Sequence, residues 1–179
     1  MFRLLLAVLF SAAICAAPVA AQNNELSFSA GGGRLIGADE SKGSRAYTLA
    51  YTRYLTERWA VEGSMEVFYV KVPSVPNSFW DGYAGLQASA LYHLRPASPD
   101  RRFVPYLTAG IGFTSTDITE IPAVRVIRMG GGFKYFFGQS RRLGLRVEAR
   151  NEIINDNGIF FPPEQINFPG ARVGVVYRF

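Results

Sequence analysis

The sequence has few of the side chains that carry metal or nucleophilic chemistry. It contains one cysteine and one histidine among 179 residues. Cys15 lies in an N-terminal segment that we expect to be removed, so the mature chain is predicted to lack disulfides, thiol chemistry and thiolate metal sites. No block of Lys and Arg indicates nucleic-acid binding. We therefore expect no cofactor, no metal site and no nucleic-acid partner. With 14% aromatic residues, disorder is not expected either.

Long apolar runs are absent except at the N-terminus, where residues 1–21 have the features of a secretory signal. Arg3 precedes the apolar stretch Leu4–Ala17, Pro18 ends it, and small residues at 19–21 predict cleavage before Gln22. A retained anchor would need a longer span. Lipoprotein processing at Cys15 is disfavoured by the bulky residue before it. Residues 22–179 then form one domain, and loss of Arg3 lowers the formal net charge from +5 to +4.

The last residues of the chain, Gly170–Phe179, alternate strictly between two kinds of side chain. Odd positions carry Ala, Val, Val, Tyr and Phe, whereas even positions carry Gly, Arg, Gly, Val and Arg. Alternation with period two indicates a strand with one apolar face. The run has ten residues, and a tilted strand needs about 9–11 to cross a bilayer. The run therefore predicts the closing strand of an outer-membrane barrel.

Seven further segments show the same alternation, and none outside the signal has a helical period. We predict an all-β fold: an eight-stranded antiparallel up-and-down transmembrane barrel. The predicted strands are about Glu25–Leu35, Arg45–Leu55, Arg58–Val70, Gly82–Arg95, Phe103–Thr114, Ala123–Phe137, Arg142–Ile153 and Gly170–Phe179. The faces of the second strand could not be assigned, because Tyr47, Leu49 and Tyr51 share a parity with Arg53.

The direction of the apolar faces decides between a membrane barrel and a soluble lipocalin-like barrel. The signal, the terminal aromatic residue and the strand lengths favour apolar faces toward lipid. Charged side chains then point inward, where each needs a partner. The predicted interior charge network comprises Glu62, Glu66, Arg128, Lys134, Arg146, Glu148, Arg150, Glu152, Arg172 and Arg178.

Connection lengths and aromatic positions predict the orientation. The connections after the second, fourth and sixth strands are shorter on average, as in periplasmic turns, so both termini are expected in the periplasm. Aromatic residues at strand ends predict two girdles at the membrane interfaces: Tyr54, Trp59, Tyr92, Phe103, Phe137 and Phe179 at the periplasmic rim, and Tyr69, Trp80, Tyr83 and Phe113 at the outer rim.

The last predicted loop is unusually apolar. Phe160, Phe161 and Phe168 are candidates for contact with a partner or with lipid, since exposed apolar patches mark binding sites. The alternative is that they extend the flanking strands or cap the barrel mouth.

Three stretches resemble the outer-membrane β-barrel family of porin-like, opacity-type proteins. Residues 54–63 resemble its second hairpin, 105–112 its fifth strand and 144–150 its seventh. The resemblance implies an eight-stranded barrel in a Gram-negative outer membrane. It also implies folding by the barrel-assembly machinery, with Tyr177 and Phe179 in the terminal assembly signal. It implies no single activity. We also expect contact with outer-membrane lipids and a monomeric state.

Three functions remain open, in this order: a structural or surface-interaction barrel, a small-solute channel, and a lipid-modifying enzyme. Side chains fill the interior of an eight-stranded barrel, which argues against a wide pore. Lipid A deacylase barrels carry a His-x-Ser motif, but here the stretch is His93-Leu94-Arg95. We therefore predict no enzymatic activity.

Overall fold

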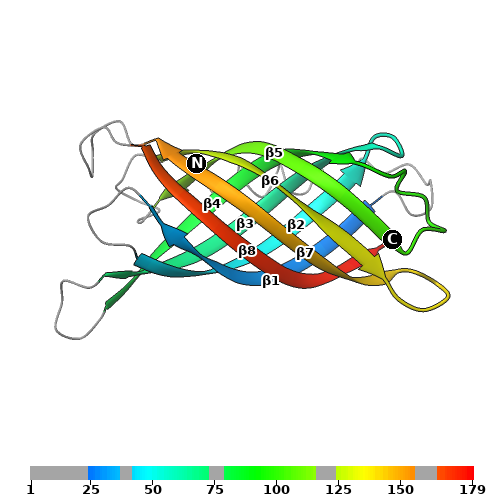
Figure 1. The fold of residues 1–179 in the computed structure, drawn as a ribbon, viewed down its shortest axis with the longest axis horizontal. Helices are drawn as coiled ribbons and strands as arrows, with labels where there is room; N and C mark the ends of the chain where they lie inside the picture. The colour runs from blue at the N-terminus through cyan, green and yellow to red at the C-terminus, as the bar shows by residue number, and fades with distance from the viewer. Residues whose placement is uncertain (1–23, 37–41, 73–78, 116–123, 156–164) are drawn as a thin grey trace, which may run out of the picture.

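The computed structural model describes residues 24–36, 42–72, 79–115, 124–155 and 165–179, which form a closed antiparallel barrel (Figure 1). Each strand pairs with the next one in sequence, and the last pairs with the first, so the predicted up-and-down barrel is confirmed. The strands are β1 (Asn24–Leu35), β2 (Lys42–Tyr54), β3 (Trp59–Val72), β4 (Phe79–His93), β5 (Phe103–Ser115), β6 (Val124–Phe136), β7 (Leu143–Asn155) and β8 (Gln165–Arg178).

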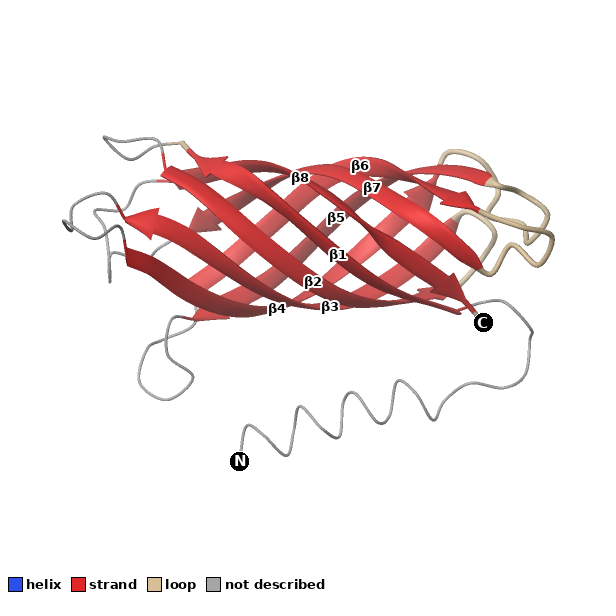
Figure 2. Ribbon diagram, turned by 90° about the horizontal axis from the view of Figure 1, so that it is seen from below, coloured by secondary structure: helices blue, strands red, loops and turns tan. Residues whose placement is uncertain are grey.

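The two ends of the barrel differ in their connections and in the position of the chain termini. The turns 55–58, 94–102 and 137–142, tan in Figure 2, lie at the same end as the C-terminus. Asn24 and Phe179 meet there: the Asn24 N–H donates to the Phe179 carbonyl oxygen at 3.3 Å, and the reverse bond measures 3.0 Å. We call this the terminal end and the opposite one the loop end.

Strand boundaries agree with the prediction to within a few residues, except for β8. The strand begins at Gln165 instead of Gly170, so part of the predicted loop is strand. Pro169 hid this extension, because proline has no N–H for a ladder bond. The β1–β8 ladder stops at the pair Gly33–Gly170, and a single bridge between Ile36 and Asn167 continues the same register. Strands also run further than predicted at the loop end, so the contrast in connection length is smaller than expected.

Alternation places apolar side chains outside and polar ones inside, as predicted. Outward side chains are large and exposed, for example Ile111 at 66%, Val175 at 55% and Phe113 at 54%. The structure also settles β2, in which Thr48 and Thr52 are buried and Tyr47 and Leu49 are exposed. Among the described residues, no helix is long and apolar enough to cross a membrane.

Two of the aromatic residues expected in the girdles lie inside the barrel instead. Tyr54 is 9% exposed and donates a hydrogen bond to a buried carboxylate. Tyr83 stacks on the buried ring of Phe68. The prediction was wrong for both because it used their position near strand ends rather than their parity. The side chain of Trp80 lies outside the described residues.

Inward glycines admit the long interior side chains. A Cβ built on Gly31 would lie 2.7 Å from both Cα and Cγ of Arg172 on the neighbouring β8. One on Gly174 would lie 2.1 Å from the Phe28 carbonyl oxygen. Glycine at these positions lets β1 and β8 approach closely while an arginine extends across the lumen.

Candidate functional site: the charged barrel interior

At the terminal end of the interior, Glu25 on β1 joins three other strands. Its carboxylate accepts hydrogen bonds from Tyr54 Oη at 2.6 Å, from Arg178 Nη2 at 3.0 Å and from Lys134 Nζ. The side chains of Glu25 and Lys134 are completely buried. Glu25 was missing from the predicted network, although it shares its parity with Ser27 and Ser29, which are also buried.

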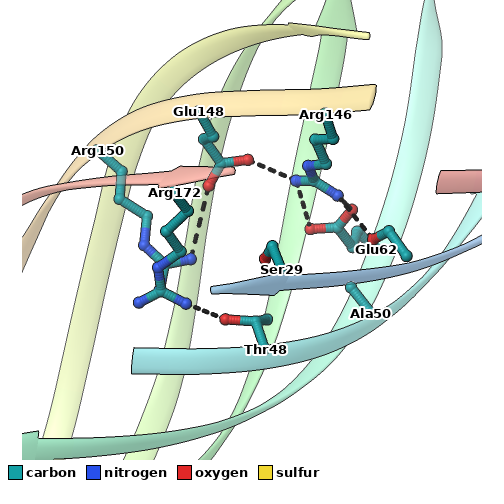
Figure 3. A pocket seen from close by; sticks show the side chains of 9 residues that line it. Ser29, Thr48, Ala50, Glu62, Arg146, Glu148, Arg150 and Arg172 are labelled. Atoms are coloured by element: carbon teal, nitrogen blue, oxygen red, sulfur yellow. Dashed lines mark hydrogen bonds and ion pairs between the residues drawn. The ribbon is translucent and has the colours of Figure 1, made fainter. Parts of the chain in front are cut away.

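In the middle of the barrel, Arg146 lies between two carboxylates (Figure 3). It donates to Glu62 through Nη1 at 2.5 Å and Nη2 at 3.1 Å, which is a bidentate arrangement. Nη2 also contacts Glu148 at 2.5 Å. The Tyr106 hydroxyl completes the group, since it donates to Glu148 at 2.7 Å and accepts from Arg146 Nε at 2.8 Å.

Toward the loop end, Glu66 on β3 collects three arginines. Arg128 Nη2 lies 2.8 Å from its carboxylate, and Arg150 and Arg172 contact the same group. Glu152 supplies a second acid, 3.2 Å from Arg128 Nε and 2.8 Å from Arg150 Nη2. The structure thus brings all ten predicted network residues into the interior, each at most 7% exposed.

These ion pairs cross the lumen. β3 and β7 lie on opposite sides of an eight-membered ring of strands, so the pairs Glu62–Arg146 and Glu66–Arg150 extend across the barrel. Each charge is buried and satisfied by an opposite one, which is the condition for its tolerance inside a protein. The prediction of an interior filled by polar side chains is confirmed.

Apolar groups close the interior beyond the charges. At the loop end, Phe68 stacks on Tyr83 with ring centroids 4.9 Å apart and contacts Phe168 at 6.2 Å. At the terminal end, Leu91, Val104, Phe136 and Val176 are buried. Phe168 is 5% exposed and belongs to β8, so its proposed contact with an outside partner was wrong and the alternative of capping the mouth describes it better. Phe160 and Phe161 lie outside the described residues.

The space left between these side chains is small. A cavity of about 10 Å³ lies among Ser27, Ser29, Thr48, Ala50 and the charged groups of Figure 3. It has room for about one water molecule, whereas ligand pockets usually enclose about 300–1,000 Å³.

Catalytic groups are sparse in the described part of the chain. No group of three or more His, Cys, Asp or Glu side chains there could hold a metal ion. His93 is fully buried at the terminal end, with Nδ1 3.2 Å from the Arg58 carbonyl oxygen and its ring stacked on Tyr54. Its Nε2 has no hydrogen-bond partner among the described residues, so no serine there completes a nucleophilic pair.

A match to a protein-family model agrees with this closed barrel, which has an apolar exterior and a charged interior. The model of the outer membrane protein beta-barrel domain matches residues 6–179. The chain belongs to this family. Its apolar exterior is therefore the surface that faces lipid in an outer membrane, and the ion pairs lie at membrane depth. The comparison with curated proteins found no match.

Solved structures show the same fold at low sequence identity. The Neisserial surface protein A (NspA) is 16% identical, with a TM-score of 0.64, and the match covers 90% of this chain and all of that one. The outer membrane enzyme PagL is 15% identical with a TM-score of 0.56, covering 83% of this chain and 97% of that one. The attachment invasion locus protein Ail of Yersinia pestis, in complex with the heparin analogue sucrose octasulfate, is 14% identical, with a TM-score of 0.51 and coverage of 89% and 100%.

The aromatic residues at the C-terminus lie on the outer surface of the barrel. Tyr177 and Phe179 are 44% and 48% exposed on the outside of the barrel, and their rings stack 6.2 Å apart. Recognition of this strand by the barrel-assembly machinery stays a prediction.

Proposed function

We propose that this outer-membrane barrel is a closed structural or surface-interaction protein with both termini in the periplasm. The observation that carries the proposal is the set of buried ion pairs that joins β3 to β6, β7 and β8 across the lumen. A solute would have to separate oppositely charged groups at membrane depth, where an unpaired charge is very unfavourable. Apolar side chains at both ends add a second barrier.

Bilayer conductance of the refolded protein tests this closed state against the small-solute channel. We expect no steady conductance from the wild type. A variant with Arg146, Arg150 and Arg172 all changed to Ala removes three side chains that fill the lumen, and it serves as the positive control. Steady single-channel steps from the wild type would overturn the closed barrel and favour the channel.

The surface-interaction part of the proposal rests on the loop end. Phe160 and Phe161 remain candidates for contact there, whereas Phe168 does not. NspA is described as a surface protein and Ail by attachment, but the likeness to this chain is one of fold. Phe160→Ser with Phe161→Ser should reduce binding of whole cells to a partner surface. Unchanged binding on every surface tested would leave the structural role alone.

A lipid-modifying activity has less support, although the structurally similar PagL is described as an outer membrane enzyme. The only histidine of the sequence lies inside the barrel, beside Tyr54 and without a serine partner among the described residues. We propose that the protein is not an enzyme. Release of fatty acid from lipid A by the refolded protein, abolished by His93→Ala, would contradict this.

A further inference from the structure

The turns at the terminal end carry an excess of arginine that the interior network does not use. They contain two acids, Glu57 and Asp100, against six arginines: Arg58, Arg95, Arg101, Arg102, Arg141 and Arg142. In contrast, the sequence of the four connections from odd-numbered to even-numbered strands, 37–41, 73–78, 116–123 and 156–164, contains six acids and neither Lys nor Arg. By sequence, the turns of the terminal end are therefore basic, whereas the connections from odd-numbered to even-numbered strands are acidic.

One of these arginines has a structural task. Arg141 adopts a left-handed backbone conformation with φ of 49° and lies 3.6 Å from the Asp100 carboxylate. It also donates to the Asp100 carbonyl oxygen, so it ties the turn 137–142 to the turn 94–102. Asp100 is therefore paired with Arg141 rather than with another arginine of these turns. Among the described residues, no ion pair joins Arg58, Arg102 or Arg142 to an acid.

These three exposed arginines border the apolar outer surface. Arg58, Arg102 and Arg142 each directly precede the first residue of a strand, and that residue is a large exposed apolar one: Trp59 at 50%, Phe103 at 42% and Leu143 at 54%. Because β3, β5 and β7 alternate with other strands, the arginines are distributed along the rim rather than gathered in a pocket.

The contacts of Arg58 indicate how deep its guanidinium group lies relative to the membrane. Its Nη1 donates to the Tyr92 hydroxyl at 3.2 Å, and the Tyr92 ring lies 4.9 Å from that of Trp59. Tyrosine and tryptophan at membrane-facing positions favour the headgroup region. The guanidinium of Arg58 thus lies at the level where lipid phosphates lie.

We propose that Arg58, Arg102 and Arg142, the arginine rim, bind anionic glycerophospholipid headgroups and enrich these lipids around the terminal end. Guanidinium groups form bidentate hydrogen bonds with phosphate oxygens, which suits them to this ligand. A distributed rim next to lipid-facing rings favours a ring of lipids over a soluble partner. That these lipids belong to the periplasmic leaflet rests on the orientation in the proposed function.

Lipid selectivity measured in vesicles tests the proposal without regard to orientation. The protein is refolded into phosphatidylcholine vesicles that contain spin-labelled phosphatidylglycerol or spin-labelled phosphatidylcholine. The motionally restricted fraction of each label gives their relative affinity for the barrel. We expect a severalfold preference for phosphatidylglycerol at low salt, with about fivefold per arginine as the upper limit. At ~1 M salt, where the Debye length is about 3 Å, the preference should largely disappear.

Three variants assign the preference to the rim. Replacing all three arginines with Gln should abolish it, whereas replacing them with Lys should retain the larger part because the charge remains. Arg125→Gln, which removes an exposed charge at the loop end, should leave it unchanged. Circular dichroism before and after heating verifies that each variant is folded.

The other outcomes either overturn the proposal or indicate a different ligand for the arginine rim. A wild type without preference, a preference that survives ~1 M salt, or a Gln variant that keeps it would overturn the proposal. Loss of the preference in the presence of inorganic phosphate at constant ionic strength would instead indicate a soluble anion, and binding of the arginine rim to isolated peptidoglycan without lipid preference would indicate a cell-wall partner. A silent barrel without lipid preference contradicts this inference alone, whereas steady conductance contradicts the proposed function alone.

Discussion

At the scale of residues, the interior depends on a few acids that each serve several bases. The described interior network contains five glutamates and six basic residues, so the positive groups must share partners. Glu66 is the extreme case, because Arg128, Arg150 and Arg172 all contact its carboxylate. The attachment of β6, β7 and β8 to β3 across the lumen therefore depends on this one side chain.

Glu66→Gln should therefore be strongly destabilising. It leaves three buried guanidinium groups with one acid fewer, and removal of one partner from a buried ion pair costs about 3–5 kcal/mol of unfolding free energy. Urea unfolding of the protein in vesicles measures the change. Glu57→Gln, at an exposed acid in a turn, should change stability by less than about 0.5 kcal/mol. Equal stability of the two variants would show that the network contributes little.

The sequence predicted ten of the eleven charged residues of the described interior network, but not which of them contact one another. Parity along a strand assigns the face of Glu62 or Arg146, whereas their contact across the barrel depends on the number of strands and their register. Glu25 was missed because it is the first residue of the predicted strand, where few neighbouring residues establish the alternation. Phe168 was misplaced because Pro169 interrupts the pattern that would have identified its strand.

At the scale of elements, the closing pair β1–β8 depends on glycine for its close approach. Gly31 and Gly174 both lie on this seam, and each would bring a Cβ within 2.1 Å of a carbonyl oxygen of the other strand. The seam joins the two ends of the described chain, so it forms only when both strands are present. We therefore expect the packing of this seam to determine whether the barrel closes.

Gly174→Ala tests this seam. The added Cβ must displace the backbone of β1, and such overpacking costs about 1–3 kcal/mol of unfolding free energy. Gly63→Ala is the matched control, since a Cβ on this strand glycine would have no atom within 4 Å. Replacing glycine with alanine in a regular strand should be neutral or stabilising by about 0.4–1 kcal/mol. Urea unfolding that affects both variants alike would contradict the role of close approach.

At the scale of the whole molecule, the barrel has distinct ends. Arginine predominates in the turns of the terminal end, and acids predominate in the sequence of the opposite connections. The described interior network, with five acids and six basic groups, has a nearly balanced charge. This polarity, together with the shared location of both termini, makes the orientation in the membrane a question that one labelling experiment can answer.

Cysteine labelling measures the proposed orientation directly. The sequence has a single cysteine, Cys15, within the predicted signal, so an introduced thiol would be the only one in the mature chain. In intact cells, a membrane-impermeant maleimide should label Asn77→Cys and should not label Ser140→Cys. After the outer membrane is made permeable, both should react. Labelling of Ser140→Cys alone in intact cells would indicate the opposite orientation and contradict the proposal.

The hydrogen bonds between Asn24 and Phe179 have a consequence for the connectivity of the chain. Because the first and last residues of the barrel are neighbours, a short linker could join them, and the chain could be opened at the turn 94–102 instead. Such a circular permutant keeps every strand pair and every ion pair of the lumen but ends in β4 rather than β8. If it folds in vesicles and fails to assemble in cells, the information for the shape of the barrel and the information for its delivery reside in separable parts of the sequence.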